Sequence, residues 1–510
     1  MDSSSSIRSI FVFTIGIFTA IWLGVSLVTD QFDTLLKFSA AGLLLFCALL
    51  GRRIWLLMIA FSSMGIPLIR GFSTHELGQV LFLSFGILML LMRRLPIRFT
   101  MGEVEWWRLA VALIIVQVYM RNPVGLSMAG AGSVGGKAYF LAALAFMASC
   151  LYGALRIEPR EIKWAYYITL FCSFLGIPLY EARLRFGGAD PGASQLNTQQ
   201  GPVDEGEATR VGFLGGIGVH LSRWIISRVH PLKACFHPLW APLILISLAA
   251  AAGSGFRNTI AIVGMYYILG LAYRGGLASV FTASILGAFG IVALAIVNLF
   301  APLPPNVQRS LTPFPGTWEQ RYKDDAKNSN EWRLEMWKEA LLTDRWIANK
   351  WLGDGLGISA TELARSQELT SRKAHLGTSG LTLHQENILA SGDYHSGPVQ
   401  TIRTVGYLGL IVILLAMTRL AILAHRQICR CRHTEWFPIA LYFFIPVIAS
   451  PFIFVFIFGE FGAAVVGLFV SGAFLTLFKN NVPLPHYVIP KRGPYILITA
   501  RNRNAVGRRL

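Results

Sequence analysis

Residues 436–478 read WFPIALYFFIPVIASPFIFVFIFGEFGAAVVGLFVSGAFLTLF, and Glu460 is the only charged residue among them. A helix needs about 20 mostly apolar residues to cross ~30 Å of hydrocarbon. The stretch is long enough for two such helices, which we predict at 436–458 and 461–478. Two membrane spans in direct succession predict that the surroundings of this chain are a lipid bilayer.

The composition of the whole chain agrees with this prediction. Of the 510 residues, 54% are hydrophobic and only 14% are charged, whereas soluble chains carry roughly 25% charged residues. The apolar runs predict an all-α, polytopic integral membrane protein with about fourteen transmembrane helices. We expect them at 8–28, 34–50, 54–69, 77–92, 107–120, 136–154, 164–180, 210–226, 239–252, 257–273, 277–300, 399–424, 436–458 and 461–478.

The net charge of +18 follows the expected topology. Cytoplasmic loops of membrane proteins carry an excess of Lys and Arg, and alternate loops here are rich in them while the intervening short loops are poorer. Both termini are therefore expected in the cytoplasm, and nucleic acid is not expected as a partner. The basic positions are Arg52, Arg53, Arg93, Arg94, Arg98, Arg156, Arg160, Lys163, Arg228, Lys233, Arg274, Arg426, Arg430 and Arg432, with six more in the tail.

One long segment, residues 301–398, interrupts the pattern of short loops, and the charge rule puts it outside the cytoplasm. It holds 11 Lys/Arg and 12 Asp/Glu, so it is nearly neutral. A loop of this size is usually functional. The chain is thus divided into a transmembrane bundle with the first eleven spans at 1–300, the extracytoplasmic loop at 301–398, the last three spans at 399–478 and a basic cytoplasmic tail at 479–510.

The loop is expected to contain helical structure. Ser329–Asn330 can cap a helix that runs through Leu342, with an apolar stripe of Leu334, Trp337 and Leu341. The glycines of the run Gly353–Gly357 then predict a tight turn.

Cysteine and histidine positions do not predict a disulfide framework or a structural metal site. None of the six cysteines lies in the loop. His425, Cys429, Cys431 and His433 form a candidate metal cluster, but no second ligand pair follows them. Reduced thiols among basic topology residues are the favoured interpretation.

Two arginines open predicted spans on the extracytoplasmic side. Arg257 follows Gly253–Phe256, and Arg210 opens the span 210–226. A guanidinium at the edge of a bilayer is costly unless it is paired or wet, and its planar fork suits phosphate recognition. The alternative for both is an anchor whose head reaches the interface. The two interpretations are balanced for Arg257, and the anchor is slightly favoured for Arg210.

Two further candidates lie in the loop. Arg333 is predicted on the loop helix, where a surface ion pair with Glu331 or Glu335 is the more common role. His395 lies just ahead of the span 399–424, and an imidazole with its usual pKa near ~6.5 suits proton transfer. His375 and His384 are rivals for that role, and the three histidines have no zinc-ligand spacing.

Four segments together resemble the bacterial O-antigen ligase and O-antigen polymerase-like family, membrane glycosyltransferases of the metal-independent GT-C architecture. Arg257 falls on the family's arginine, Gly406 follows His395 by eleven residues as in the family, and Ser396 stands where the family usually has Asn. The segments are TRVGFLGGIGVHLSRWI (209–225), GSGFRNTIAIVGMYYIL (253–269), EWRLEMWKEALLTDRWIANKWLGDGLG (331–357) and HSGPVQTIRTVGYLGLI (395–411).

The resemblance implies a mechanism and a location. The donor would be a glycan on undecaprenyl diphosphate at the periplasmic face of the bacterial inner membrane. Arg210 and Arg257, with Arg333 assisting, would bind the diphosphate and stabilise the leaving group, and His395 would take the proton of the acceptor hydroxyl. No metal or other cofactor is required, because the arginines supply the positive charge. The acceptor would be another glycan, lipid A-core or a different hydroxyl, and polysaccharide-assembly proteins are candidate partners.

The sequence leaves other functions open. Polymerase and ligase share these motifs, and we lean towards a polymerase. A polysaccharide flippase or another multi-span transporter is the rival class. The lack of a convincing internal repeat and the nearly charge-free span interiors weigh against it. A structural membrane protein, in which the arginines of the loop would be dispensable, is the third candidate.

Overall fold

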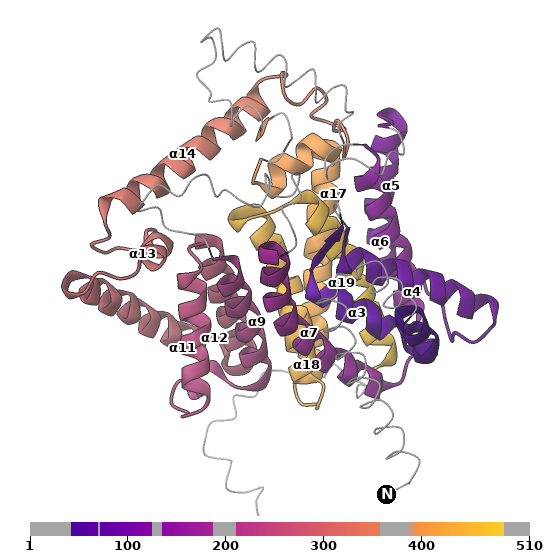
Figure 1. Ribbon diagram of the computed structural model, residues 1–510, viewed down its shortest axis with the longest axis horizontal. Helices are drawn as coiled ribbons and strands as arrows, with labels where there is room; N and C mark the ends of the chain where they lie inside the picture. The colour runs from indigo at the N-terminus through magenta and orange to yellow at the C-terminus, as the bar shows by residue number, and fades with distance from the viewer. Residues whose placement is uncertain are drawn as a thin grey trace, which may run out of the picture.

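The computed structural model describes residues 42–69, 72–124, 135–186, 211–357, 388–389, 392 and 394–483. These residues are almost entirely helical (Figure 1), so the predicted all-α class is confirmed. The helices before residue 301 are α3 (Ile54–Met64), α4 (Thr74–Leu91), α5 (Glu103–Arg121), α6 (Lys137–Ala154), α7 (Pro159–Phe186), α9 (Gly212–Arg228), α10 (Pro231–Ala234), α11 (Trp240–Gly253) and α12 (Arg257–Phe300), with the 3-10 turn η1 (Gly51–Arg53). The later ones are α13 (Pro305–Leu311), α14 (Gln320–Leu342), α17 (Gly397–Cys431), α18 (Phe437–Phe452), the π-helical turn η2 (Ile453–Ile457) and α19 (Phe461–Asn481).

The strands form one small antiparallel ribbon. β1 (Pro67–Ile69) pairs with β2 (Phe72–Ser73) ahead of α4. The Ser73 side chain accepts a hydrogen bond from His75 N, and Glu76 bonds back to Ser73 N at 2.6 Å. This capping box satisfies backbone donors at the start of α4.

Eight helical stretches in the described part of the chain are long and apolar enough to cross a membrane. They are Gly42–Met64, Thr74–Leu91, Lys137–Ala154, Pro159–Ala182, Arg257–Phe300, Gly397–Cys431, Phe437–Ile457 and Phe461–Asn481, and Trp240–Gly253 is a shorter apolar helix. The chain is therefore an all-α protein with membrane-spanning helices.

The fourteen predicted spans do not map one to one onto these stretches. The predicted spans 257–273 and 277–300 are two arms of α12, which meet at Gly276 with φ 71° and ψ −173°. The predicted span 107–120 corresponds to α5, which is less apolar than the eight stretches because it carries Glu103, Glu105, Arg108 and Arg121. The predicted span 8–28 lies outside the described residues.

The buried centre of the bundle is built from aromatic and aliphatic side chains on helices distant in sequence. α17 packs on α18, α6 packs on α19, and α3 packs on both α4 and α7. These helices occupy the middle and right of Figure 1, while α14 runs diagonally at the upper left, above α11, α12 and α13. Trp55, Tyr152, Phe444 and Phe469 are fully buried in the centre of the bundle. Because lipid is as apolar as these side chains, close packing rather than burial from water stabilises such contacts.

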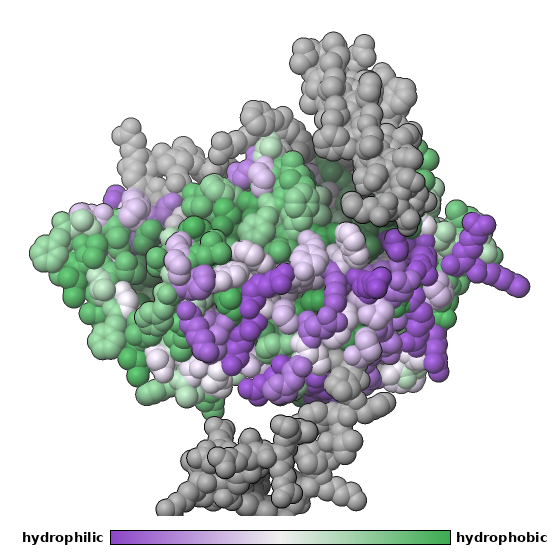
Figure 2. Space-filling model, turned by 90° about the horizontal axis from the view of Figure 1, so that it is seen from below, coloured by the Kyte–Doolittle hydropathy of each residue, from purple (hydrophilic) through white to green (hydrophobic). Residues whose placement is uncertain are grey.

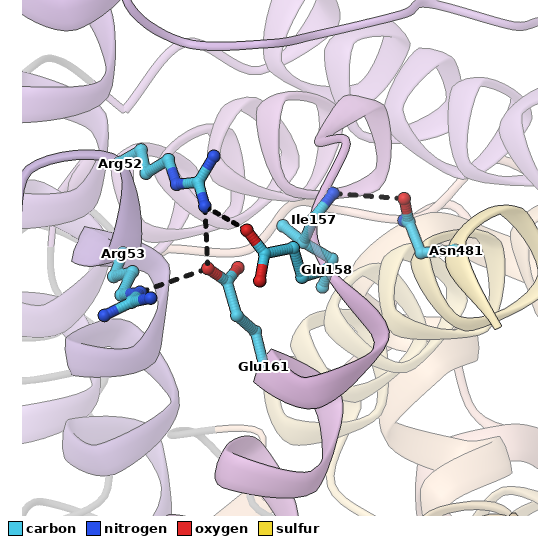
Figure 3. A network of polar contacts seen from close by, with 6 residues as sticks. All are labelled: Arg52, Arg53, Ile157, Glu158, Glu161 and Asn481. Carbon is cyan, nitrogen blue, oxygen red and sulfur yellow. Dashed lines mark hydrogen bonds and ion pairs between the residues drawn. The ribbon is translucent and has the colours of Figure 1, made fainter. Parts of the chain in front are cut away.

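The loops that the charge rule assigns to the cytoplasm lie together at one end of the bundle. Arg52 Nη2 lies 2.5 Å from Glu158 Oε1, and Arg53 Nε lies 3.1 Å from Glu161 Oε1 (Figure 3). Asn481 at the end of α19 accepts a hydrogen bond from Ile157 N at 3.1 Å. Seen from this end, hydrophilic residues extend across the middle of the face (Figure 2). These contacts support the predicted grouping of the basic loops.

Residues 301–357, the longest described part of the predicted loop, lie at the opposite end. Its main element, α14, begins at Gln320 and not at the predicted Ser329–Asn330 cap, although it ends at Leu342 as expected. Residues 320–328 continue the helix because they contain no glycine or proline, and their side chains tolerate helical geometry. The predicted apolar stripe is shifted, since Leu334 is exposed and Met336 is buried.

A break in α17 holds the loop against the bundle. At Gly406 the backbone adopts φ 75° and ψ −179°, which frees backbone groups on both sides of the break. Residues 350–355 of the loop pair with these groups, because unpaired backbone polar groups are costly at membrane depth. Asp354 N donates to Arg403 O at 2.7 Å, Gly355 N to Thr404 O at 3.0 Å, Tyr407 N to Lys350 O at 2.8 Å and Leu408 N to Trp351 O at 3.2 Å.

The end of α5 and the start of α6 hold the same turn from the other side. Arg121 Nη2 donates to Leu352 O at 2.7 Å and to Gly353 O at 2.8 Å. Tyr139 Oη accepts from Leu356 N at 3.0 Å. The predicted tight turn at Gly353–Gly357 is thus confirmed, and it joins the loop to three helices. We call residues 350–356 with their partners on α5, α6 and α17 the loop clasp.

Gly406→Ala should destabilise the loop clasp. A Cβ at Gly406 would collide with the Trp351 carbonyl, and its positive φ is unfavourable for alanine. We expect a loss of about 1–3 kcal/mol in the free energy of unfolding, visible as a lower melting temperature of the purified protein in detergent. Gly264→Ala in α12 is the matched control, because a Cβ there meets no atom within 4 Å. Equal melting temperatures for the two variants would contradict the role of the break.

Candidate functional site

A tight turn sets Arg257 at the loop end of the bundle. Ser254 Oγ accepts a hydrogen bond from Phe256 N at 3.2 Å, just before α12 begins at Arg257. The Ser254 carbonyl accepts from Val211 N at 2.9 Å, so the starts of α9 and α12 lie side by side. Arg257 Nη1 then donates to Ala326 O of α14 at 3.5 Å. This guanidinium is directed towards the loop and connects the bundle to α14.

Another arginine of this region, Arg309, was not among the residues predicted from the sequence. It lies on α13, and its Nε is 2.8 Å from Asp325 Oδ2 on α14. Only 11% of its side chain is exposed. Arg257 lies close enough to Arg309 and Asp325 to interact with both electrostatically. The short helix α13 therefore brings a second guanidinium to the Arg257 side of α14.

Arg333 lies on the face of α14 that is turned towards the protein. Tyr322, Ala326, Met336 and Ala340 are the buried residues of this helix. Arg333 follows Ala326 by seven residues, or two helical turns, so it shares their face. In the described part of the chain, no ion pair joins Arg333 to Glu331 or Glu335, and Glu331 instead lies 3.8 Å from Lys327. The surface ion pair considered from sequence is therefore not the arrangement in the structure.

The surroundings of Arg333 are unfavourable for a cation. Burial lowers the pKa of its guanidinium, nearby Arg257 and Arg309 lower it further, and Asp325 opposes them in part. Its Nε is buried and has no hydrogen-bond partner among the described residues. A buried donor without a partner costs free energy, so this arrangement favours an anion that accepts from Arg333.

Together these side chains form a cationic cluster, which we define as Arg257, Arg309, Arg333 and Asp325. Three guanidinium groups and one carboxylate leave two net positive charges in a partly buried site. Guanidinium groups bind phosphate oxygens through pairs of charge-assisted hydrogen bonds. The cluster therefore has the charge and the kind of donor groups that a diphosphate requires.

His395 lies beside the helix that carries Arg333. Its ring centroid is 6.3 Å from that of Trp332, the residue next to Arg333, and 6.3 Å from that of Phe458, which follows η2. The backbone of His395 is in the left-handed region, with φ 49°. A non-glycine residue in that region is uncommon, and such strain often occurs at functional sites.

The neighbours of His395 fix its position. Tyr394 is fully buried, and its carbonyl accepts a hydrogen bond from Trp337 Nε1 of α14 at 2.7 Å. Ser396 is the N-cap of α17 and accepts from Val399 N. Because Ser and Asn are equally good N-caps, serine at this position keeps the helix start that an asparagine would give. His395 is therefore held between α14 and α17.

The structure brings together most of the described candidates. Arg257 and Arg333 share the cationic cluster, and His395 contacts the residue next to Arg333. Arg210 lies outside the described residues, as do the rival histidines His375 and His384. Arg309 was missed because no motif surrounds it, and only the packing of α13 against α14 reveals its place.

The candidate metal cluster around His425, at the opposite end of the bundle from the cationic cluster, is not assembled. Cys429 Sγ lies 3.7 Å from His425 Nε2, but His425 Nδ1 is bonded to Tyr273 Oη at 2.6 Å and Cys431 is fully buried. Across the described ranges, no group of three or more His, Cys, Asp or Glu side chains is placed to hold a metal ion.

Comparison with known proteins does not assign a family. No protein-family model matches the sequence, and no curated protein is significantly similar to it. Function is therefore inferred from the motifs and from the geometry of the cationic cluster.

Proposed function

We propose that this protein is a membrane glycosyltransferase that moves a glycan from an undecaprenyl-diphosphate-linked donor to an acceptor hydroxyl. The observation that carries the proposal is the cationic cluster, in which three arginines that influence one another share one carboxylate, with His395 against Trp332, the residue next to Arg333. A diphosphate on a lipid would reach such a cluster from the membrane edge, since Arg257 begins a membrane-spanning helix.

In this proposal the arginines act on the leaving group. As the bond between the anomeric carbon and the phosphate oxygen breaks, its electron pair passes to that oxygen, and lipid diphosphate departs. Arg257, Arg309 and Arg333 stabilise the added negative charge through hydrogen bonds that strengthen as the charge develops. Arg210, the remaining predicted arginine, would join them at the start of α9. The arginines supply the positive charge that the leaving group needs.

His395 acts on the acceptor. Its imidazole accepts the proton of the acceptor hydroxyl while that oxygen forms the new bond to the anomeric carbon, and it later releases the proton to water. The fixed backbone of Tyr394 and the N-cap at Ser396 hold the ring, and the rings of Trp332 and Phe458 limit its movement. A positioned base of this kind contributes typically about 10²–10⁴-fold to a rate.

The proposed location is the bacterial inner membrane, with the cationic cluster on the periplasmic side. The basic loops at the opposite end support this orientation through the charge rule. We favour a polymerase, in which the acceptor is another repeat unit, over a ligase that uses lipid A-core or a different acceptor. Deletion of the protein separates the two, because unpolymerised single units indicate a polymerase and long chains on lipid carrier indicate a ligase.

Arg257→Ala should reduce glycan transfer by at least about 100-fold, because one donor to the leaving group is lost. Arg257→Lys should restore only part of the activity, since an ammonium cannot make the paired contact. The measurement is gel analysis of cell-surface and lipid-linked glycans at matched protein levels in the membrane. Lipid-linked units should accumulate on the outer face.

Arg321→Gln is the matched control for this experiment, because Arg321 is an exposed arginine of α14 that pairs with Glu319 at 2.8 Å. Retained transfer in Arg257→Ala would refute the role of that arginine. Lipid-linked units confined to the cytoplasmic face would instead indicate a flippase.

His395→Ala should block transfer and still permit the donor to bind, because the imidazole is proposed to act on the acceptor. The measurement pairs a transfer assay with binding of lipid-linked donor to the purified protein. Loss of donor binding together with transfer would show that His395 supports the structure of the site and is not its base.

A further inference from the structure

A cavity lies inside the bundle, and it shares no residue with the cationic cluster. Its volume is about 370 Å³, and residues of α3, α6, α7, α9, α17, α18 and α19 line it. Most of the lining side chains are apolar, including Leu420, Phe443, Val447 and Phe474. Its size falls within the usual range of ligand pockets, and such pockets are mainly apolar with a few placed polar groups.

One cation, Arg223 of α9, lines this cavity. Its guanidinium stacks over the Tyr442 ring, with the carbon Cζ 4.4 Å from the centroid, and Nη2 donates to Tyr442 O at 3.3 Å. Its Nε is buried and has no partner among the described residues. None of the residues that line the cavity is acidic. A cation inside a membrane bundle without a carboxylate is costly and usually marks a functional site.

Three hydroxyl groups that line the same cavity are also buried without a hydrogen-bond partner among the described residues. They are Ser62 Oγ, Thr169 Oγ1 and Tyr152 Oη. Buried polar groups without protein partners are satisfied by water or by a ligand. With Arg223 Nε, they place donors from four different helices in the lining of one cavity, and the described part of the chain gives these donors no partner.

The walls and the edge of the cavity indicate what kind of molecule carries an acceptor for these donors. A small inorganic anion would leave most of the apolar lining uncovered. Ala463 and Gly467 line the cavity and are also exposed on the outer surface of α19. The cavity therefore reaches the side of the bundle that faces lipid, and a hydrocarbon chain from the bilayer can enter there.

We infer that this cavity binds an anionic amphiphile, whose carboxylate or phosphate group pairs with Arg223 and whose hydrocarbon chain lies against α18 and α19. The site depends on neither the cationic cluster nor the proposed transfer reaction. The carboxylate of a fatty acid and the phosphate of a lipid share the required chemistry, and competition between them distinguishes the source.

The test uses the full-length protein in lipid nanodiscs and a diazirine-bearing palmitate as a photoaffinity probe. We expect saturable labelling of α18 and α19. Unlabelled palmitate should displace the probe if the natural ligand is a fatty acid, and phosphatidylglycerol should displace it if the natural ligand is a phospholipid. Arg223→Met should weaken probe binding by roughly tenfold or more, because a charge-assisted contact is lost. Arg223→Lys should retain most of the binding. Arg228→Met, on the same helix but outside the cavity, should leave labelling unchanged.

Gly467→Leu tests the same site without altering the cation. A Cβ at Gly467 meets no atom within 4 Å, so a leucine side chain can enter the cavity without disturbing the backbone. This variant should fold and should lose labelling. Labelling that does not saturate, or that persists equally in Arg223→Met and Gly467→Leu, would show that the probe does not bind specifically in this cavity, and it would overturn the inference.

Discussion

Repulsion among three guanidinium groups is the interaction on which the candidate site depends. Arg257, Arg309 and Arg333 come from a membrane helix, a short loop helix and a long loop helix. Among the residues that the structure describes, only Asp325 offsets their charge. Such an arrangement costs free energy in the unliganded protein, and it stabilises any bound group with several negative oxygens. A lipid diphosphate has that chemistry. In the proposed function the site would therefore exchange stability for anion binding, as functional sites commonly do.

The loop clasp holds this arrangement in place. The break at Gly406 exposes backbone groups of α17 that the turn at 350–355 pairs with, and Arg121 of α5 fixes the turn from the other side. The same helix α17 begins at Ser396, next to His395. One element thus links the position of the candidate base to the position of the loop that carries Arg333. A disturbance at the clasp would move both sides of the site together.

The sequence predicted the helical class, and it singled out three residues that the structure places in or near the candidate site, because those features have local signals. Apolar runs of the right length indicate spans, and Arg257, Arg333 and His395 lie in recognisable motifs. Arg309 lies in no recognisable motif, and Arg223 lies within the quoted segment 209–225 but was not singled out. The importance of both depends on which helices pack beside them. The predicted start of α14 was wrong, because the residues before the plausible cap at Ser329 also favour a helix and continue it towards Gln320. The fourteen predicted spans exceed the eight long apolar helices described, partly because α5 carries charges that pair within the bundle, as Arg108 does with Glu105 at 3.3 Å. The proposed membrane side and the reaction itself remain predictions.

The most direct measurement of the central claim is the effect of inorganic pyrophosphate on the melting temperature of the purified protein, in EDTA so that metal ions do not contribute. A ligand that binds the folded state stabilises it by RT ln(1 + c/Kd) at free ligand concentration c, so the melting temperature rises with ligand concentration and keeps rising above Kd. We predict an increase that depends on the pyrophosphate concentration in this way for the unaltered protein and for Arg321→Gln, and a much smaller one for Arg309→Gln. No increase with pyrophosphate, or the same increase in Arg309→Gln, would contradict the assignment of the arginines to a diphosphate.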